Sequence, residues 1–67
     1  MDGRVAYLEA KLPGAEVVIC QLSTGHFRVY AEWRGGRRWA VRTVGLSDAV
    51  LDQAADVLAV RHEMRPS

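Results

Sequence analysis

Apolar residues recur at helical spacing near the start of the chain. A short helix over about 3–12 is predicted by three of them: Val5, Leu8 and Leu12. Asp2 stands where it would cap this helix, and the pair Pro13-Gly14 would end it, because proline and glycine break helical structure.

A second helix is predicted over about 48–63. Ser47 is a good N-cap for it, because a serine oxygen can accept a hydrogen bond from the first turn of main-chain N–H groups. Leu46 and Leu51 are spaced to pack against each other across this cap. These signals make the C-terminal helix the most clearly marked element of the chain.

The middle of the chain carries the signals of three strands. Residues 16–22, "EVVICQL", are rich in β-branched side chains and do not alternate, which predicts a strand buried on both faces. Residues 26–33 and 37–44 alternate apolar and polar side chains, which predicts two half-exposed strands joined at Gly35-Gly36. We therefore expect one small α+β domain in the order α-β-β-β-α, with a three-stranded antiparallel sheet and both helices packed on one face.

The register of the second hairpin follows from which residues would face each other. A two-residue turn at Gly35-Gly36 would place Arg42 opposite Val29 and mix arginine into an apolar face. A three-residue loop over 34–36 places Val41 opposite Val29 instead. The sequence thus predicts the three-residue loop, with Gly36 at positive φ as the bulge residue after a type I turn.

This register sorts the two strands into a core face and an open face. The core face is expected to pack on Val50, Ala54 and Leu58, and it holds Phe27, Val29, Ala31, Trp33, Trp39 and Val41. The open face holds Arg28, Tyr30, Glu32, Arg38, Ala40 and Arg42. Glu32 is expected to pair with Arg38, whereas Arg28 and Arg42 face each other as like charges. The tryptophans are therefore interpreted as core residues and not as an exposed stacking platform.

Charge is distributed unevenly, although the 67 residues sum to +1 at pH 7. Residues 26–46 carry five arginines and one glutamate, and residues 47–67 carry two arginines and four acidic residues. Such segregation favours a function in binding a charged partner. Asp48, Asp52 and Asp56 share one helix face and are interpreted as a solvated row, with binding of a cation or a basic partner as the alternative.

The sequence holds no recognisable catalytic or metal-binding set. Cys20 is the single cysteine and, in mid-strand, is expected to be a small buried residue. His26 is expected to be exposed and His62 to suit the end of a helix dipole, and neither has a second ligand at metal spacing. We expect no enzymatic activity, no metal and no cofactor. No stretch approaches the ~20 apolar residues of a membrane span, so the chain is expected to be soluble and cytoplasmic.

The open face supplies the candidate site. The predicted partner-binding residues are Arg28, Tyr30, Arg34, Arg37, Arg38 and Arg42. Arginine offers a planar fork of donors that suits carboxylates, and tyrosine with arginine is the combination enriched at interface hot spots. The leading hypothesis is a small regulatory or inhibitor protein, of the antitoxin or phage-inhibitor kind, that binds an acidic surface of a protein partner.

Two alternative functions stay open. The expected element order, with "GHF" at 25–27 before an arginine-rich hairpin, is similar to the double-stranded RNA-binding domain, which implies nucleic-acid binding. That family opens its final helix with lysines, where this chain has the acidic stretch "LSDAVLD" at 46–52. The other alternative is a structural homodimer in which the basic sheet face of one copy meets the acidic helix face of the next.

Overall fold

A computed structural model describes residues 3–64, and its elements confirm the predicted α-β-β-β-α order. The elements are α1 (Gly3–Lys11), β1 (Ala15–Ser23), β2 (His26–Trp33), β3 (Arg38–Val44) and α2 (Asp48–Met64). The three strands form one antiparallel sheet in the order β1-β2-β3, as predicted. Asp2, the expected cap of the first helix, lies outside the described residues.

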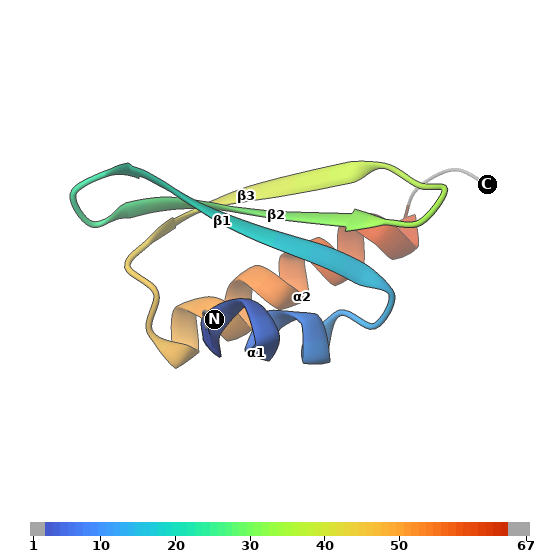
Figure 1. Cartoon of the computed structure of the whole chain (residues 1–67), viewed down its shortest axis with the longest axis horizontal. Helices are drawn as coiled ribbons and strands as arrows, with labels where there is room; N and C mark the ends of the chain where they lie inside the picture. The colour runs from blue at the N-terminus through green and yellow to red at the C-terminus, as the bar shows by residue number, and fades with distance from the viewer. Residues whose placement is uncertain (1–2, 65–67) are drawn as a thin grey trace.

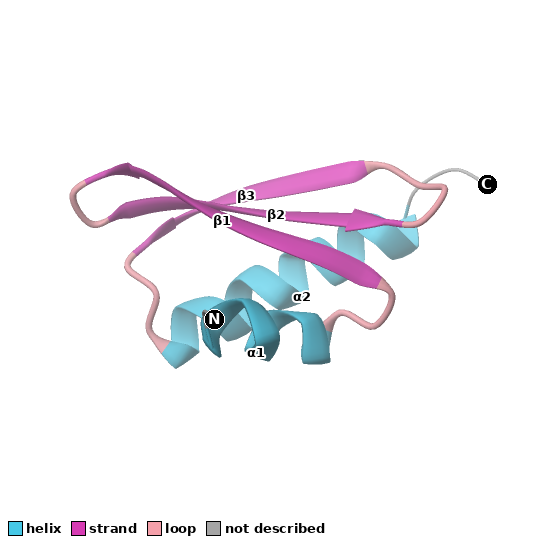
Figure 2. Cartoon of the chain, viewed as in Figure 1, coloured by secondary structure: helices cyan, strands magenta, loops and turns pink. Residues whose placement is uncertain are grey.

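The molecule has two layers. Both helices lie on one side of the twisted sheet, and the other side is left uncovered, which confirms the predicted packing (Figures 1 and 2). The turn between β1 and β2 extends past the helical layer at one end of the molecule (Figure 2). Within residues 3–64, no helix is long and apolar enough to cross a membrane.

The core fills the space between the sheet and the helices. Its buried residues are Leu8, Leu12, Val17, Val29, Ala31, Trp33, Leu51, Ala55 and Leu58. Alternate residues of β2 enter this core because successive strand side chains point to opposite faces. On α2, Leu51 and Ala55 are buried while Val50, which was expected in the core, is only half-buried. Ala54 and Leu58, the other two residues expected in the core, are buried, so the buried stripe of α2 keeps two of the three expected residues and adds Leu51 and Ala55.

The prediction that β1 is buried on both faces is wrong. Val17 is its one fully buried residue, whereas the side chains of Val18 and Leu22 are 49% and 40% exposed. Cys20, expected to be buried, is exposed as well. The physical reason is that β1 is an edge strand of a sheet whose second face is uncovered, so an apolar run does not guarantee burial.

The register predicted for the β2–β3 hairpin is confirmed. Val29 pairs with Val41 and Ala31 pairs with Trp39. The turn differs from the prediction, since the positive φ of +69° falls on Gly35 and not on Gly36. The N–H of Gly36 donates to the carbonyl of Trp33 at 2.9 Å, so Gly35 occupies the third position of a four-residue turn. A positive φ at that position is typical of a type II turn.

Ser47 caps α2 as predicted. The N–H of Val50 donates to Ser47 Oγ at 3.3 Å, and the N–H of Leu51 donates to the Ser47 carbonyl at 2.9 Å. This cap fixes where the chain turns from β3 into α2, so it places the whole buried stripe of α2 under the sheet. Leu46, just before the cap, packs against the core.

Candidate functional site

On the uncovered face of the sheet, the side chains of register partners form rows that run across the strands. Cross-strand pairing in order β1, β2, β3 gives the rows Glu16–Glu32–Arg38, Val18–Tyr30–Ala40 and Cys20–Arg28–Arg42. Arg28 and Arg42 therefore lie beyond the middle row, whereas Arg38 shares the row near the β2–β3 turn with the two acidic residues. We call the group formed by Arg28, Tyr30, Arg38 and Arg42 the arginine–tyrosine patch.

Tyr30 stands at the centre of this patch and contacts two guanidinium groups. Arg28 Nη1 donates to the Tyr30 hydroxyl at 3.5 Å, and the Arg38 guanidinium carbon lies 4.9 Å from the centre of the Tyr30 ring. The first contact is a long hydrogen bond and the second is a cation–π contact. Together they hold an aromatic ring with a cation at its edge and another over its face.

Arg28 and Arg42 face each other directly across β2 and β3, as the sequence predicted. Within residues 3–64, neither they nor Arg38 form an ion pair with a carboxylate. The expected pairing of Glu32 with Arg38 is thus wrong: the two are register partners, but the Arg38 guanidinium turns toward the ring of Tyr30. The patch consequently keeps three arginine charges that the described part of the chain does not neutralise by contact.

The remaining two predicted site residues lie away from the patch. Arg34 is exposed in the turn after β2, and Arg37 is exposed just before β3. Arg34 borders an open groove of about 480 Å³ whose other charged residues are acidic: Glu9, Glu16 and Glu32. Arg34 therefore belongs to an acidic neighbourhood. The structure brings four of the six predicted residues together and leaves Arg34 and Arg37 at the end of the hairpin.

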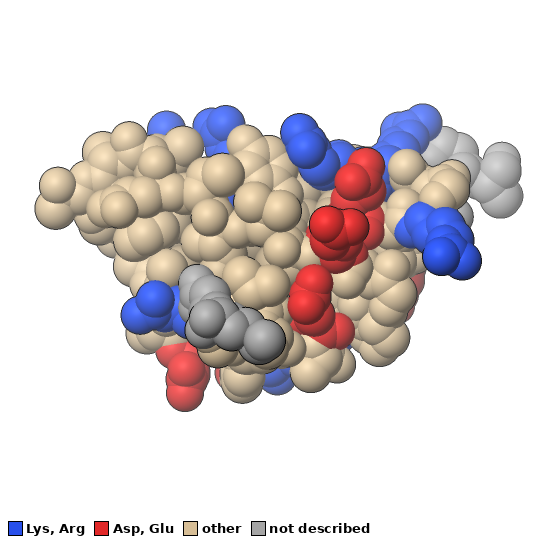
Figure 3. Space-filling model, viewed as in Figure 1, with Lys and Arg blue, Asp and Glu red and all other residues tan. Residues whose placement is uncertain are grey.

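The surface charge agrees with this division. Basic side chains gather along the uncovered side of the sheet, and an acidic strip runs from that side down toward the helices (Figure 3). Among residues 3–64, no group of three or more histidine, cysteine or acidic side chains could hold a metal ion. The groove lined by Glu9, Glu16 and Glu32 therefore borders the arginine–tyrosine patch with negative charge. Its described residues do not form a group that could hold a metal ion.

The tryptophans lie on the helical side of the sheet, as predicted. Trp33 is 8% exposed, and its indole N–H donates to the Pro13 carbonyl at 3.2 Å. Its ring stacks on His62 with centroids 4.0 Å apart and planes 6° from parallel. His62 thus covers a core tryptophan, a role that the sequence did not indicate because it depends on how α2 crosses the sheet. His26 is exposed, as expected, and contacts Ser23 and Thr24 in the β1–β2 turn.

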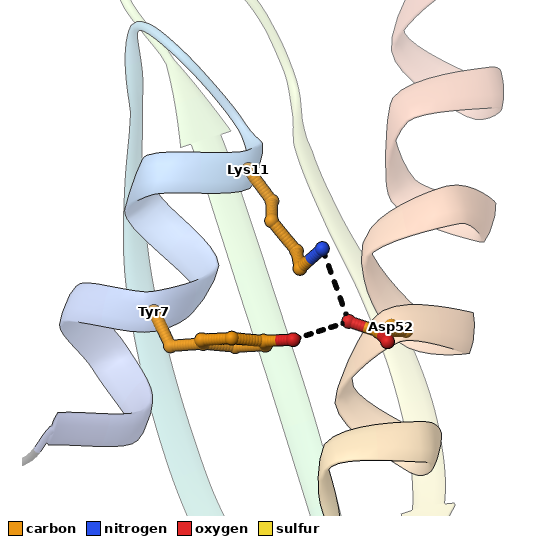
Figure 4. Close-up of polar contacts among 3 residues, drawn as sticks. All are labelled: Tyr7, Lys11 and Asp52. Carbon is orange, nitrogen blue, oxygen red and sulfur yellow. Dashed lines mark hydrogen bonds and ion pairs between the residues drawn. The ribbon is translucent and has the colours of Figure 1, made fainter.

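Of the three aspartates on α2 that were interpreted as a solvated row, Asp48 and Asp56 are exposed, whereas Asp52 contacts two residues of α1. Tyr7 and Lys11, one turn apart on α1, both point at Asp52 (Figure 4). The Tyr7 hydroxyl donates to Asp52 Oδ1 at 2.7 Å, and Lys11 Nζ lies 3.1 Å from the same oxygen. These contacts join the two helices on the side of the molecule away from the patch.

The same three groups shift one another's titration. The hydrogen bond from Tyr7, followed by that from Lys11, holds the pKa of Asp52 below its ordinary value. The hydrogen bond to Asp52 raises the pKa of Tyr7 and, in the same way, the pKa of Lys11. The contacts therefore favour the ionised form of Asp52 and the protonated forms of Tyr7 and Lys11. We call these three residues the clamp between α1 and α2.

Comparison with known proteins gives no relative for this chain. No protein-family model, no curated protein and no solved structure matches it. The geometry of the uncovered sheet face is therefore the basis for a functional proposal.

Proposed function

We propose that the chain is a small non-catalytic regulatory or inhibitor protein, of the antitoxin or phage-inhibitor kind, acting in the cytoplasm. Its uncovered sheet face binds an acidic surface of a protein partner. The observation that carries this proposal is the arginine–tyrosine patch: Tyr30 lies between two guanidinium groups, and three arginines lack carboxylate partners within residues 3–64.

The patch has the chemistry of a protein-binding hot spot. Arginine and tyrosine are enriched at such sites because both offer large contact areas together with directional donors. A carboxylate that arrives between Arg28 and Arg42 would replace their mutual repulsion with two charge-assisted contacts. Glu16 and Glu32, at the other end of the face, would repel an acidic partner there and so fix its orientation.

Protein binding is favoured over nucleic-acid binding by the position of the acidic residues. A duplex or single strand presents phosphates along its whole length, and a ligand laid along the strands would meet Glu16 and Glu32 as well as the arginines. In addition, α2 begins with Asp48 where the RNA-binding domains that this element order resembles carry lysines. A compact acidic patch on a protein could instead contact Arg28 and Arg42, which lie two residues along β2 and β3 from Tyr30 and away from Glu16 and Glu32.

The experiment is affinity purification of the tagged chain from its native cell or that cell's host, with and without nuclease, followed by identification of the bound protein and nucleic acid. We expect one protein in stoichiometric amount, retained after nuclease treatment and lost from the Tyr30→Ala variant. Recovery of nucleic acid that a mobility-shift assay shows to bind directly, with an affinity that falls steeply with salt, would contradict the proposal.

A further inference from the structure

The two edges of the sheet are protected very differently. On the β3 edge, Arg61 of α2 donates from Nη1 to the Ala40 carbonyl at 2.7 Å. The same strand carries the exposed cations Arg38 and Arg42. Charged side chains and covering groups are common devices that keep an edge strand from pairing with another strand. The β3 edge is therefore guarded along most of its length.

The β1 edge is covered only at its first half. The N–H of Ala15 donates to the Leu12 carbonyl at 3.0 Å, and the N–H of Val17 donates to Glu9 Oε2 at 3.2 Å. Because Val17 points its main-chain groups outward, Ile19 and Gln21, two and four residues further on, do so too. Within the described chain, no side chain hydrogen-bonds to the main chain of Ile19 or Gln21.

The second half of β1 also lacks the side chains that protect an edge. No charged residue occurs from Val17 to Ser23. Val18 and Cys20 are exposed on the uncovered face of the sheet, and Leu22 is exposed at the register shift between Gln21 and Ser23. The β1–β2 hairpin also extends beyond the helical layer at this end (Figure 2).

We propose that this edge is a self-pairing surface, on which β1 of a second copy adds antiparallel to β1 and makes a continuous six-stranded sheet. The second copy is the occupant that the sequence of β1 fits. With the two-fold axis at Cys20, Ile19 faces Gln21 of the other copy, and the two equivalent pairs form about four main-chain hydrogen bonds. This pairing brings the exposed Val18 of each copy close to the exposed Leu22 of the other, which lies at the register shift of β1.

Charge also favours this self-pairing. Glu16 is the one charged residue of β1 and lies four residues from the axis at Cys20, so the Glu16 side chains of the two copies lie at opposite ends of the paired segment and do not meet. The equivalent pairing through β3 would bring arginines together. The proposal does not depend on the proposed function, because the dimer leaves both arginine–tyrosine patches on the uncovered side of the shared sheet.

Cys20 reports directly on this register. The axis places the two Cys20 residues opposite each other in a non-hydrogen-bonded pair, with Cα atoms about 4.5 Å apart. That separation lies within the ~4.4–6.8 Å range of disulfides. Under diamide, which accepts two electrons and two protons from the two thiols, we expect rapid formation of a disulfide-linked dimer. A Cys20→Ser, Val44→Cys variant, with its thiol at a 69%-exposed position on the guarded β3 edge, should cross-link several-fold more slowly.

The reduced protein provides a second, independent test. Sedimentation should show a dimer whose fraction rises with concentration, while hydrogen exchange shows growing protection of the Ile19 and Gln21 amides. Gln21→Pro removes an outward N–H from each copy and leaves the bonds of β1 to β2, so it should weaken the dimer by roughly tenfold or more. Gln21→Val keeps the N–H and should still dimerise.

Three results would overturn the proposal. One is a monomer at the highest soluble concentration. Another is a dimer that Gln21→Pro leaves intact but that arginine substitution on the sheet face abolishes. The third is equal cross-linking rates for Cys20 and for the cysteine at position 44. A mixed assembly of this chain with a strand of another protein, without dimer in the purified chain, would count as the first of these.

Discussion

Arg28 and Arg42 lie opposite each other across β2 and β3, with no carboxylate paired to either within residues 3–64. Like charges directly opposite in an antiparallel pair destabilise a sheet, so this arrangement lowers the stability of the isolated chain. Under the proposed function, this cost is offset by binding, because carboxylates of a partner would interact with both arginines.

Arg28→Glu separates stability from binding at this position. The variant replaces a like-charge pair with an opposite-charge pair, so we expect the free energy of unfolding to rise by about 0.2–1 kcal/mol in low salt. Partner capture should fall at the same time. Urea denaturation and pull-down on the same preparation measure the two effects. A variant that is less stable than wild type and captures the partner equally well would contradict this reading of the pair.

Gly35 carries the backbone conformation on which the β2–β3 turn depends. Its φ is +69°, and a Cβ added there would meet nothing within 4 Å, so the cost of a side chain comes from the backbone alone. Gly35→Ala should destabilise the fold by about 1 kcal/mol, measured by thermal denaturation. The matched variant Gly36→Ala should change stability by less than about 0.5 kcal/mol. A larger loss of stability for Gly36→Ala than for Gly35→Ala would instead support the bulge at Gly36 that the sequence predicted.

At the scale of elements, periodicity predicted what is local and missed what depends on neighbours. The order of elements and the β2–β3 register follow from alternation along the chain and from which residues can share a face, and both were predicted correctly. The burial of β1 was not, because an apolar run such as 16–22 looks the same in a central strand and at an edge. The choice between Gly35 and Gly36 was also beyond the pattern, since either glycine tolerates positive φ.

The candidate site shows the same division. The register placed Arg28, Tyr30, Arg38 and Arg42 on one face, but it could not show that Arg38 would contact Tyr30 in preference to Glu32. The clamp at Asp52 was likewise hidden, because its partner Tyr7 lies 45 residues away in the sequence. Contacts of this kind depend on side-chain direction and helix crossing, which neither composition nor spacing encodes.

The clamp between α1 and α2 predicts a pH dependence of stability. The pKa of Asp52 is lowered below 3.8 in the folded chain, so its contribution is present above that pH and is lost as pH falls through the folded value. The pKa values of Tyr7 and Lys11 are raised above 10.0 and 10.5, so their contribution is present below those values and is lost as pH rises through the folded ones. The clamp should therefore stabilise most between about pH 4 and 10.

Asp52→Asn tests this window. The difference in unfolding free energy between wild type and variant should be largest near neutral pH and should shrink below about pH 4 and above about pH 10. Urea titrations at several pH values measure it. Asp56→Asn, on the same helix but without a recorded contact to α1, serves as the control and should show no such window. A constant difference across the whole range would mean that the carboxylate charge of Asp52 contributes nothing.

At the scale of the whole molecule, the helical side and the uncovered sheet side of the fold differ in character. The helical layer and its clamp stabilise the core, and the sheet presents its other face and the second half of β1 to the surroundings (Figures 1 and 3). A face that carries unneutralised arginines around a held tyrosine contributes little to folding. The proposed binding function would account for these features, and the second half of β1 is where we propose that two copies pair.

Two matched double variants test the binding face most directly. Arg28→Glu with Arg42→Glu reverses the charge of the patch while keeping a like-charge pair across the strands. Asp56→Lys with Glu63→Lys reverses two charges on α2, away from the sheet face. Both should fold with melting temperatures near that of wild type, which thermal denaturation checks before use.

The deciding measurement is the amount of partner that each variant retains in affinity purification from the native cell, relative to wild type. We expect the α2 variant to retain the partner and the Arg28/Arg42 variant to bind it at least tenfold more weakly, which corresponds to about 1.4 kcal/mol. Retention by the Arg28/Arg42 variant together with loss by the α2 variant would contradict the account and would move the binding surface to the helical side.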